Sequence, residues 1–313
     1  MNLSAEPETG SFRPQAAGGD DLPQVLYIMG TGRSGTTVLE ILLTNNPGLA
    51  GVGEATHIFR DGFIGNDVCS CGLRARSCPV WSAVARRCGW KDDDVEGLAK
   101  LFHDVAWHSR FPGLMAGFLP DVQRARYRMV NACLFTAAST LTASPVLVDS
   151  SKYAGRALEL ARLFPEHLRV ICLTRSPAGL AAAFAKPDTD EQRPKSLLAV
   201  LPYYLYTLAC FRIVAWKLGP RLLKVSYEDF MSDPVETLQR IAQWSGLDLG
   251  HAIGSLRDDR WLEVGHMVTG NRLRRQWRIK FKPRVPINYQ VGMMKQPVIW
   301  LMNRYRNISG FQE

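Results

Sequence analysis

The sequence predicts an α/β fold: a P-loop-like parallel β-sheet flanked by helices on both faces. Two observations predict it. Short apolar runs alternate with longer segments whose apolar residues recur at helical spacing, and this alternation is typical of parallel sheets. In addition, the run from Val25 to Glu40 joins an apolar strand, a loop with three glycines and a helix. That succession forms a cradle for a phosphate, because loop N–H groups and the helix dipole converge on an anion.

Size and composition fit this fold. The chain has 313 residues, of which 46% are hydrophobic, enough for one large α/β domain or two small ones. The net charge of +9 favours an anionic ligand, nucleic acid or a membrane surface, or it serves solubility alone. Residues 1–22 are rich in Gly, Pro, Ser, Ala and acidic groups without apolar periodicity. We expect a disordered arm there, followed by a folded domain over residues 23–313.

The elements can be predicted in chain order. We expect strands at Val25–Gly30, Val146–Ser150, Arg169–Arg175 and Leu222–Ser226, a short strand ending before Glu54, and helices near 36–45, 122–142, 154–163, 178–186 and 196–218. A further helix follows the cap Asp233 and Pro234 and ends at Gly246. Ligands of such sheets bind at the carboxyl ends of the strands. The glycine loop, the Asp149–Lys152 segment and Arg175 should therefore share one edge of the sheet.

The glycine loop lacks one residue of a nucleotide triphosphatase loop. Gly30 and Gly35 fit the pattern G-x-x-x-x-G-K-[ST], but Thr36 stands where the lysine should be. The cation within the loop is Arg33. Without that lysine a triphosphate loses its β/γ charge clamp, so the loop favours a phosphate-bearing donor other than ATP.

Six stretches occur in the order in which one enzyme family carries them. They are Gly32–Thr37, Gly51–Glu54, Cys69–Gly72 with Cys78–Trp81, Val148–Lys152 with Val170–Pro177, the weaker Tyr227–Phe230 with Asp233-Pro234, and His266–Asn271. With them the chain resembles the sulfotransferases that use 3′-phosphoadenosine 5′-phosphosulfate (PAPS), in particular their bacterial and carbohydrate-type branch. The resemblance spans residues 25 to about 275. It implies a single sulfotransferase domain and a donor with one 5′-phosphosulfate and one 3′-phosphate, which explains the missing lysine.

The resemblance also implies which residues hold the donor. Those assigned to the phosphosulfate are Arg33, Ser34, Gly35, Thr36 and Thr37, although helix capping is an alternative for the two threonines. Arg175 is assigned to the 3′-phosphate, and Tyr227, Gly270, Asn271 and Arg274 complete the donor site. The chain departs from the family beside Arg175, with Ser176 for an Asp, Ala178 for a second Arg, and Ala183 for the partner Ser. Ser176 or the basic run near residues 272–284 would have to compensate.

Sulfuryl transfer to a hydroxyl needs a general base and a cation. The base takes the acceptor's proton, and the resemblance assigns that role to Glu54. His57 is the alternative base and is assigned to the acceptor site. Glu40, on the helix after the loop, would be an ordinary surface-facing acid.

Lys152 is the cation expected where negative charge develops. The alternative is a surface lysine paired with Asp149. Arg33 is the second catalytic cation, and its fixed charge neutralises the leaving group. The reaction itself needs no metal, so none is predicted.

Two segments are expected to shape the cleft. Residues 60–125 form a helical acceptor-side insertion, and residues 266–290 form a basic lid, with His266 assigned to the acceptor. Seven cations and no acid lie between Arg272 and Arg284, so a nucleic-acid patch or a solvated loop are alternatives. The predicted partner is a small-molecule or glycan acceptor rather than nucleic acid. Two other functions remain open: a P-loop kinase or other phosphotransferase, and a non-catalytic nucleic-acid or membrane-binding module.

The cysteines favour a cytoplasmic enzyme. Their number, seven, is odd and they are scattered, unlike a secreted disulfide framework. Cys69, Cys71 and Cys78, with Cys88 as a fourth ligand, allow a zinc site or a disulfide, but free thiols are favoured. No run reaches 18 uninterrupted apolar residues, and no signal peptide is visible, so no transmembrane segment is expected.

Overall fold

Five parallel strands form the central sheet of the computed structural model, which describes residues 22–186, 194–283, 289, 292 and 295–311. Their order is β2-β3-β1-β4-β5. The strands are β1 (Gln24–Gly30), β2 (Leu49–Gly51), β3 (Val146–Lys152), β4 (Leu168–Thr174) and β5 (Leu222–Ser226). The predicted α/β class with a parallel sheet is therefore confirmed. The arm predicted for residues 1–22 lies outside the described residues, apart from Leu22.

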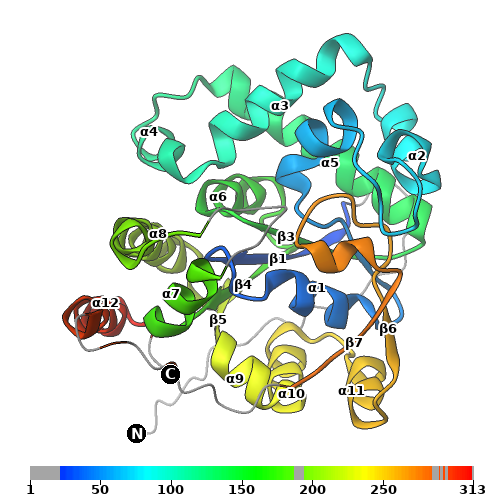
Figure 1. Cartoon of the computed structure of the whole chain (residues 1–313). Coiled ribbons are helices and arrows are strands. Elements are labelled where there is room, and N and C mark those ends of the chain that lie inside the picture. Colours follow the sequence, from blue (N-terminus) through cyan, green and yellow to red (C-terminus); the bar gives the residue numbers. More distant parts are fainter. Residues whose placement is uncertain (1–21, 187–193, 284–288, 290–291, 293–294, 312–313) are drawn as a thin grey trace, which may run out of the picture.

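Helices cover both faces of this sheet (Figure 1). On one side lie α2 (Pro79–Arg87), α3 (Asp92–Ala106), α4 (Phe111–Met115), α5 (Asp121–Thr142), α6 (Ala154–Leu163), α7 (Pro177–Ala185), α8 (Leu197–Leu218) and α12 (Gln296–Ile308). On the other lie α1 (Thr36–Thr44), α9 (Tyr227–Ser232), α10 (Pro234–Ser245) and α11 (Gly250–Arg257). Strand β1 separates the two apolar cores, because Tyr27 and Met29 face the first core while Leu26 and Ile28 face the second.

The predicted strands and helices agree with the structure to within one or two residues. The main difference concerns β3, which continues two residues past the predicted end and so carries Lys152 as its last residue. Helix α10 begins and ends at the residues that its capping pattern predicts. Asp233 accepts a hydrogen bond from the Glu236 N–H at 2.8 Å, and Gly246 adopts φ 75°.

The connection between β2 and β3 is helical, as expected for residues 60–125. It begins with a 3₁₀ turn (Ala55–His57) and a π-helix (Ile58–Ile64), and a second 3₁₀ turn (Ala75–Ser77) precedes α2. A third (His108–Arg110) precedes α4. A disulfide joins Cys88, the residue after α2, to Cys133 in α5. Cys88 is therefore not the fourth zinc ligand that the sequence offered.

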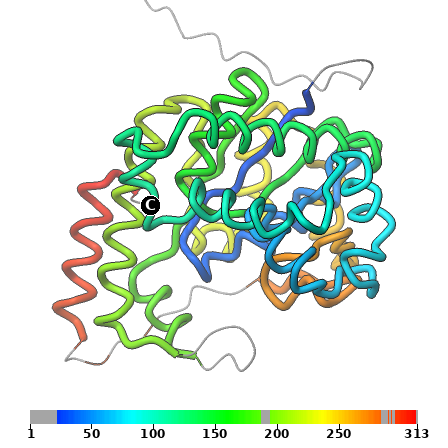
Figure 2. Tube along the Cα trace, turned by 90° about the horizontal axis from the view of Figure 1, so that it is seen from above, coloured from blue at the N-terminus to red at the C-terminus, as the bar shows by residue number. Residues whose placement is uncertain are grey.

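Helix α8 is the longest apolar helix among the described residues. Together with the following turn (Gly219–Arg221) it has the length and composition that a membrane span requires, and 44% of its most apolar window is buried. It packs on α6, α7 and α12, with Phe211 and Val214 fully buried. Figure 2 shows α12 running alongside it. One face of the helix is thus packed against the domain, while Leu198 and Trp216 are exposed.

A small antiparallel pair carries the predicted lid segment to the sheet edge. Strand β6 (Trp261–Glu263) pairs with β7 (Arg278–Lys280), and a 3₁₀ turn (Arg272–Arg275) lies between them. This hairpin places Gly270 and Asn271 beside the start of α1.

Candidate active site

The loop after β1 forms an anion cradle at the carboxyl edge of the sheet. Gly35 is the residue before α1 and adopts φ 83°, and a Cβ there would lie 2.8 Å from the Tyr227 ring. Both constraints require glycine. Thr36 and Thr37 begin α1 and line the cleft beside Arg33. Helix N–H groups at this position have no partner four residues earlier, so they favour an anionic ligand.

Ser34 supports the loop instead of facing the cleft. Its hydroxyl is fully buried and hydrogen-bonds with Thr31. The N–H of Gly32 donates to the hydroxyl of Tyr203 at 2.9 Å, an anchor from α8 that sequence reasoning did not identify. The structure thus brings Arg33, Gly35, Thr36 and Thr37 to the cleft, whereas the Ser34 side chain lies behind them.

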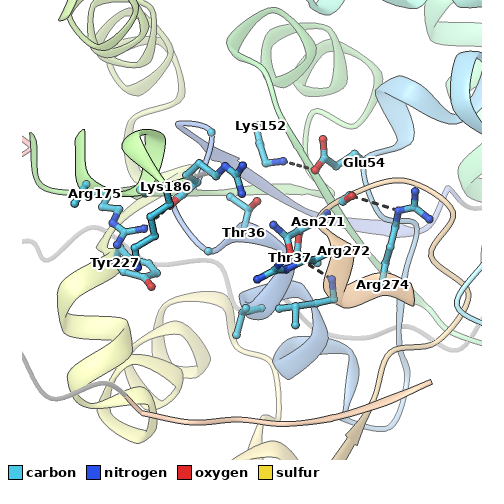
Figure 3. Close-up of a pocket in the computed structure, with 18 of the residues that line it drawn as sticks. Thr36, Thr37, Glu54, Lys152, Arg175, Lys186, Tyr227, Asn271, Arg272 and Arg274 are labelled. Carbon is cyan, nitrogen blue, oxygen red and sulfur yellow. Dashed lines mark hydrogen bonds and ion pairs between the residues drawn. The ribbon is translucent and has the colours of Figure 1, made fainter. Parts of the chain in front are cut away.

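Arg175 marks the other end of the cleft (Figure 3). It follows β4 directly, and its guanidinium stacks on the Tyr227 ring, 4.1 Å from the ring centroid. One Nη donates to the carbonyl of Arg33 at 2.8 Å, and the other donates to the hydroxyl of Tyr289. The buried Nε makes no hydrogen bond to any described residue. A buried cation with an unused donor favours an anionic ligand.

Ser176, one of the residues beside Arg175 that differ from the family pattern, has hydrogen-bond partners of its own. The Ser176 hydroxyl donates to Glu228 at 2.7 Å and accepts from the Gly179 N–H as the cap of α7. It is therefore engaged and faces a carboxylate, which disfavours it as a replacement phosphate ligand. Ala183 lines the cleft, and so do Lys186 and Lys195. Sequence reasoning missed these two lysines because they follow no motif.

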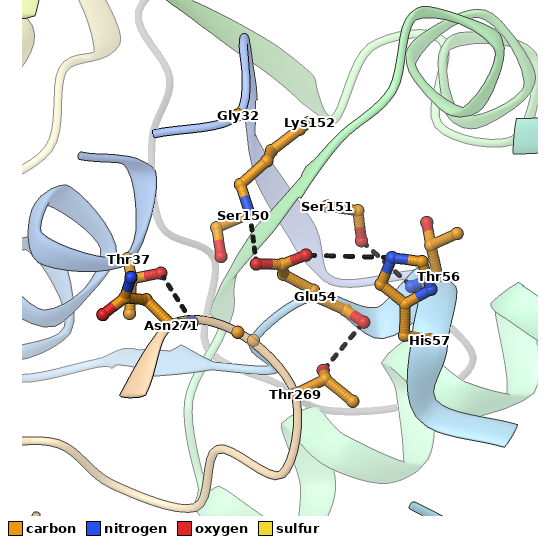
Figure 4. A network of polar contacts seen from close by, with 12 residues as sticks. Gly32, Thr37, Glu54, Thr56, His57, Ser150, Ser151, Lys152, Thr269 and Asn271 are labelled. Carbon is orange, nitrogen blue, oxygen red and sulfur yellow. Dashed lines mark hydrogen bonds and ion pairs between the residues drawn. The ribbon is translucent and has the colours of Figure 1, made fainter. Parts of the chain in front are cut away.

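Glu54 and Lys152 form an ion pair at the centre of the cleft (Figure 4). The Lys152 ammonium donates to one carboxylate oxygen of Glu54, and the His57 Nε2 lies 3.8 Å from the other. The sequence-predicted base, cation and alternative base are thus brought together. The alternative pairing of Lys152 with Asp149 is wrong, because Asp149 binds the buried Arg156 at 2.7 Å instead.

The backbone of Lys152 is held in an unusual conformation. Its φ is 77°, a region that costs a residue with a side chain about 1 kcal/mol or more. The pairing of β3 with β1 is irregular at the same point, between the partners of Tyr27 and Met29. The irregular strand end is what directs this lysine toward Glu54.

Glu40 is buried, and the expectation of a surface-facing acid is wrong. Its side chain is fully buried and accepts hydrogen bonds from the Gly53 N–H at 2.7 Å and from the Ser150 hydroxyl. Burial raises the pKa of the Glu40 carboxyl to about 8, although both hydrogen bonds lower it. Helical periodicity could not reveal this role, because the partners lie on other elements.

An aromatic wall lines the cleft beside His57. Trp107 stacks on Tyr153 with ring centroids 5.3 Å apart, and both contact the His57 ring edge-on. The Tyr153 hydroxyl lies 3.2 Å from His57 Nε2. Burial lowers the pKa of His57 to about 4, against the raising effect of Glu54. His57 is therefore a neutral hydrogen-bonding group at pH 7.

The predicted lid segment packs against Glu54 and the start of α1. The Thr269 hydroxyl donates to the Glu54 carbonyl at 2.8 Å, and the Asn271 N–H donates to the Thr37 hydroxyl at 3.4 Å. A Cβ on Gly270 would stand 3.7 Å from a Glu54 carboxylate oxygen. The guanidinium of Arg274 instead holds the lid, through Asp67 at 3.1 Å and the carbonyls of Val68 and Gly270.

His266 is not among the described residues that line the cleft. Its Nδ1 lies 3.3 Å from the sulfur of Cys78 and 3.9 Å from that of Cys69. The acceptor role implied by the resemblance is therefore not supported by its position.

The cleft as a whole has a volume of about 1810 Å³. Single drug-sized ligands occupy about 300–1,000 Å³, so the space suits two substrates side by side. Anion-binding groups lie at its two ends, and an acid, a cation and aromatic rings lie between and beside them. This arrangement suits group transfer from an anionic donor to a neutral acceptor.

Comparison with known proteins identifies the family. The sulfotransferase family profile matches residues 24–251. This chain belongs to the sulfotransferase family. Enzymes of this family use PAPS as their co-substrate. A search of curated proteins finds no match.

Solved structures agree with this sulfotransferase at the level of the fold. The sulfotransferase domain from the curacin biosynthetic pathway is 14% identical, with a TM-score of 0.53 over 94% of this chain and 99% of that one. Sulfotransferase STF9 from Mycobacterium avium is 16% identical, with a TM-score of 0.46 over 92% of this chain and 77% of that one. At these identities the first similarity supports the shared fold.

Proposed function

We propose that this sulfotransferase moves a sulfuryl group from PAPS to a hydroxyl of a carbohydrate, glycolipid or small secondary metabolite. The observation that carries the proposal is the contact between Glu54 and Lys152 beside the anion cradle. A hydroxyl acceptor must lose its proton at the point where negative charge develops on the donor. A carboxylate and an ammonium held together at this point meet both needs.

The residues of the cleft fit a donor with two separated anionic groups. The start of α1 and Arg33 suit the phosphosulfate, because Gly35 lets backbone N–H groups approach it closely. Arg175, with its unused Nε, suits the 3′-phosphate at the opposite end. Lys186 and Lys195 would make the contacts to the 3′-phosphate that Ala183 cannot make, since all three line the same cleft.

The proposed chemistry uses three side chains. Glu54 accepts the proton of the acceptor hydroxyl as its oxygen attacks sulfur. The new O–S bond forms while the S–O bond to the 5′-phosphate breaks, and Lys152 and Arg33 neutralise the charge that grows on the departing oxygen. The proton on Glu54 then passes to water. Catalysis is mainly positioning and charge stabilisation, as in phosphoryl transfer.

The aromatic wall supports an acceptor with an apolar face next to its hydroxyl. Trp107 and Tyr153 present stacked rings, and neutral His57 offers a hydrogen-bonding nitrogen between them and Glu54. A sugar ring has such a face and fits against aromatic side chains.

Donor binding is tested by calorimetry with 3′-phosphoadenosine 5′-phosphate (PAP) and with ATP on the whole chain. We expect PAP to bind and ATP to bind more weakly, because the loop lacks the triphosphate lysine. No PAP binding at high micromolar concentration would contradict the proposed donor. Turnover of ATP without PAPS would instead establish the phosphotransferase alternative.

The base is tested with Glu54→Gln, assayed with labelled PAPS against a panel of hydroxyl acceptors. We expect transfer to fall by about 10²- to 10⁴-fold, because the variant cannot take the proton. PAP affinity should persist or rise, since Lys152 loses its competing carboxylate. Glu96→Gln on the exposed face of α3 is the matched control. Transfer by the Glu54 variant at nearly the wild-type rate would show that another group is the base.

A further inference from the structure

Three thiols and one imidazole meet outside the set of described residues that line the cleft, and the proposed reaction uses none of them. Cys69, Cys71, Cys78 and His266 each offer one ligand atom, and these atoms all lie within 4.8 Å of one another. Cys78 and His266 are 188 residues apart in sequence. The fold, rather than chain proximity, therefore assembles the group.

The spacing of the ligand atoms matches a tetrahedral metal ion. Zinc–sulfur and zinc–nitrogen bond lengths place two sulfur ligands about 3.8 Å apart and a sulfur and a nitrogen about 3.6 Å apart. The sulfurs of Cys69 and Cys78 are separated by 3.6 Å. His266 Nδ1 lies 3.3 Å from the Cys78 sulfur and 3.9 Å from the Cys69 sulfur. Each of these three separations is within about 0.3 Å of the tetrahedral value. The Cys71 sulfur lies within 4.8 Å of the other three ligand atoms.

We propose that Cys69, Cys71, Cys78 and His266 bind one structural zinc ion. Three thiolates and one imidazole fill a tetrahedral shell with protein ligands, which is typical of structural rather than catalytic zinc. Soft sulfur ligands in this geometry also select zinc over magnesium or calcium. The sequence analysis predicted no metal and favoured free thiols. Its candidate fourth ligand was Cys88, whereas His266 lies far along the chain.

The chain holds these ligands in place through contacts of its own. The Ser70 N–H and hydroxyl both donate to the Met267 carbonyl, at 2.9 and 3.0 Å. The buried Trp81 donates from Nε1 to the His266 carbonyl at 2.6 Å. Cys69 and Cys78 are themselves buried. Two segments are thus aligned before any ion binds, which lowers the cost of binding.

The environment also favours a thiolate at Cys78. Cys78 precedes the first residue of α2, and a helix N-terminus favours negative charge. Metal ligation requires deprotonated cysteines.

The consequence for the enzyme is a fixed lid segment. His266 is three residues before Thr269, which holds the Glu54 backbone, and five before Asn271, which contacts Thr37. Zinc would tie this stretch to the segment that leads into α2. The ion would thus position the base and the cradle without touching either substrate.

The first test is the metal content of the whole chain, produced without a histidine tag in zinc-supplemented medium and dialysed against metal-free buffer. Elemental analysis should find about one zinc per chain. Cys71→Ser and His266→Gln should each lose the ion or bind it more than about tenfold more weakly. Cys210→Ser is the matched control, because Cys210 is a buried free thiol outside the cluster, and it should retain zinc.

The second test uses the wild-type chain and so survives any folding defect in the variants. The metal-free protein is titrated with cobalt(II), whose thiolate charge-transfer and tetrahedral d–d absorption bands report the ligand set. We expect both sets of bands, and their loss on addition of zinc. Chelation of the zinc should also lower the thermal midpoint and weaken PAP binding, because the lid segment loosens.

Several results would overturn the proposal: zinc-free protein with no cobalt bands, iron or copper in place of zinc, or a Cys69–Cys78 disulfide found by thiol counting and intact mass. These readouts need neither donor nor acceptor. Failure of the zinc proposal is therefore distinguishable from failure of the proposed sulfuryl transfer.

Discussion

The position of Glu54 depends on hydrogen bonds that other residues make to the backbone at and beside it. The Thr269 hydroxyl binds its carbonyl, and the buried Glu40 binds the N–H of Gly53, the residue before it. A Cβ on Gly51 would lie 2.7 Å from a Glu40 carboxylate oxygen, so the backbone closely covers this acid. We infer that Glu40 is a positioning residue for Glu54, the proposed base, rather than a second base.

Glu40 should make stability depend on pH. Its folded-state pKa of about 8 lies above the ordinary value of 4.5, so the folded state holds this proton more tightly than the unfolded state. Stability from this group is complete below pH 4.5 and falls as the pH rises to about 8. Glu40→Gln, which mimics the protonated form, should gain stability relative to wild type across this range.

Urea unfolding of both proteins at several pH values measures this difference. Glu96→Gln, on an exposed helix surface, should show no such trend. A difference between Glu40→Gln and wild type that stays constant from pH 5 to pH 8.5 would contradict the raised pKa.

For single residues, the sequence predicted which side chains lie at the cleft better than it predicted which side chains are buried. The places of Glu54, Lys152 and Arg175 in the cleft could be predicted because each lies at or just after the carboxyl end of a strand and matches a family motif. The burial of Glu40 could not, since its partner Ser150 is 110 residues away. Local sequence patterns do not indicate a contact between residues so far apart in the chain.

At the scale of elements, the donor site depends on how α9 meets the start of α1. Tyr227 is the first residue of α9. The edge of its ring lies against Gly35, and the face of the ring stacks on the Arg175 guanidinium. One aromatic ring thus sets the spacing between the cradle and the far-end arginine. The capped turn after β5 fixes that ring, because Ser226 accepts from the Asp229 N–H.

Replacing this ring should weaken donor binding. Tyr227→Leu removes the face under Arg175, and loss of a cation–π contact of about 0.5–2 kcal/mol predicts about 2- to 30-fold weaker PAP binding. Tyr227→Phe keeps the face and should bind PAP nearly as wild type does. Calorimetry measures both. Equal losses in the two variants would mean that the hydroxyl, not the ring, is the important group.

Regular elements were predictable because their hydrophobic periodicity is local. The strands and helices around the sheet follow that rule. The π-helix Ile58–Ile64 and the Cys88–Cys133 disulfide do not, because no periodic signal marks either of them. The lid was predicted from its motif, and its covering role stays a prediction. Beyond Pro283 several of its positions lie outside the described residues.

At the scale of the whole molecule, one sheet separates two cores with different tasks. The core beneath α1 and α9 supports the cradle, and the core on the other face supports the helices of the β2–β3 connection. The Cys88–Cys133 disulfide joins the end of α2 to α5, and Cys88 packs against the core that Tyr27 and Met29 face. Neither cysteine lines the cleft.

Removing this disulfide should lower stability while sparing donor affinity. It closes a loop of 45 residues, for which the chain-entropy model gives a stabilisation of up to about 4 kcal/mol. Cys88→Ser combined with Cys133→Ser should lower the thermal midpoint and leave the PAP dissociation constant unchanged. The phosphine TCEP, chosen because it is not a thiol, should destabilise the wild type but not the double variant. A weaker PAP affinity in the double variant would show that the two cores are coupled.

The ion pair between Lys152 and Glu54 has a kinetic consequence. While the ammonium occupies the carboxylate, that oxygen is a poor proton acceptor for an incoming hydroxyl. An arriving phosphosulfate competes for the ammonium and frees the carboxylate. We therefore expect an ordered sequence in which the donor binds first and the acceptor second. In the resting enzyme the carboxylate of the proposed base stays paired with Lys152 and does not accept a proton.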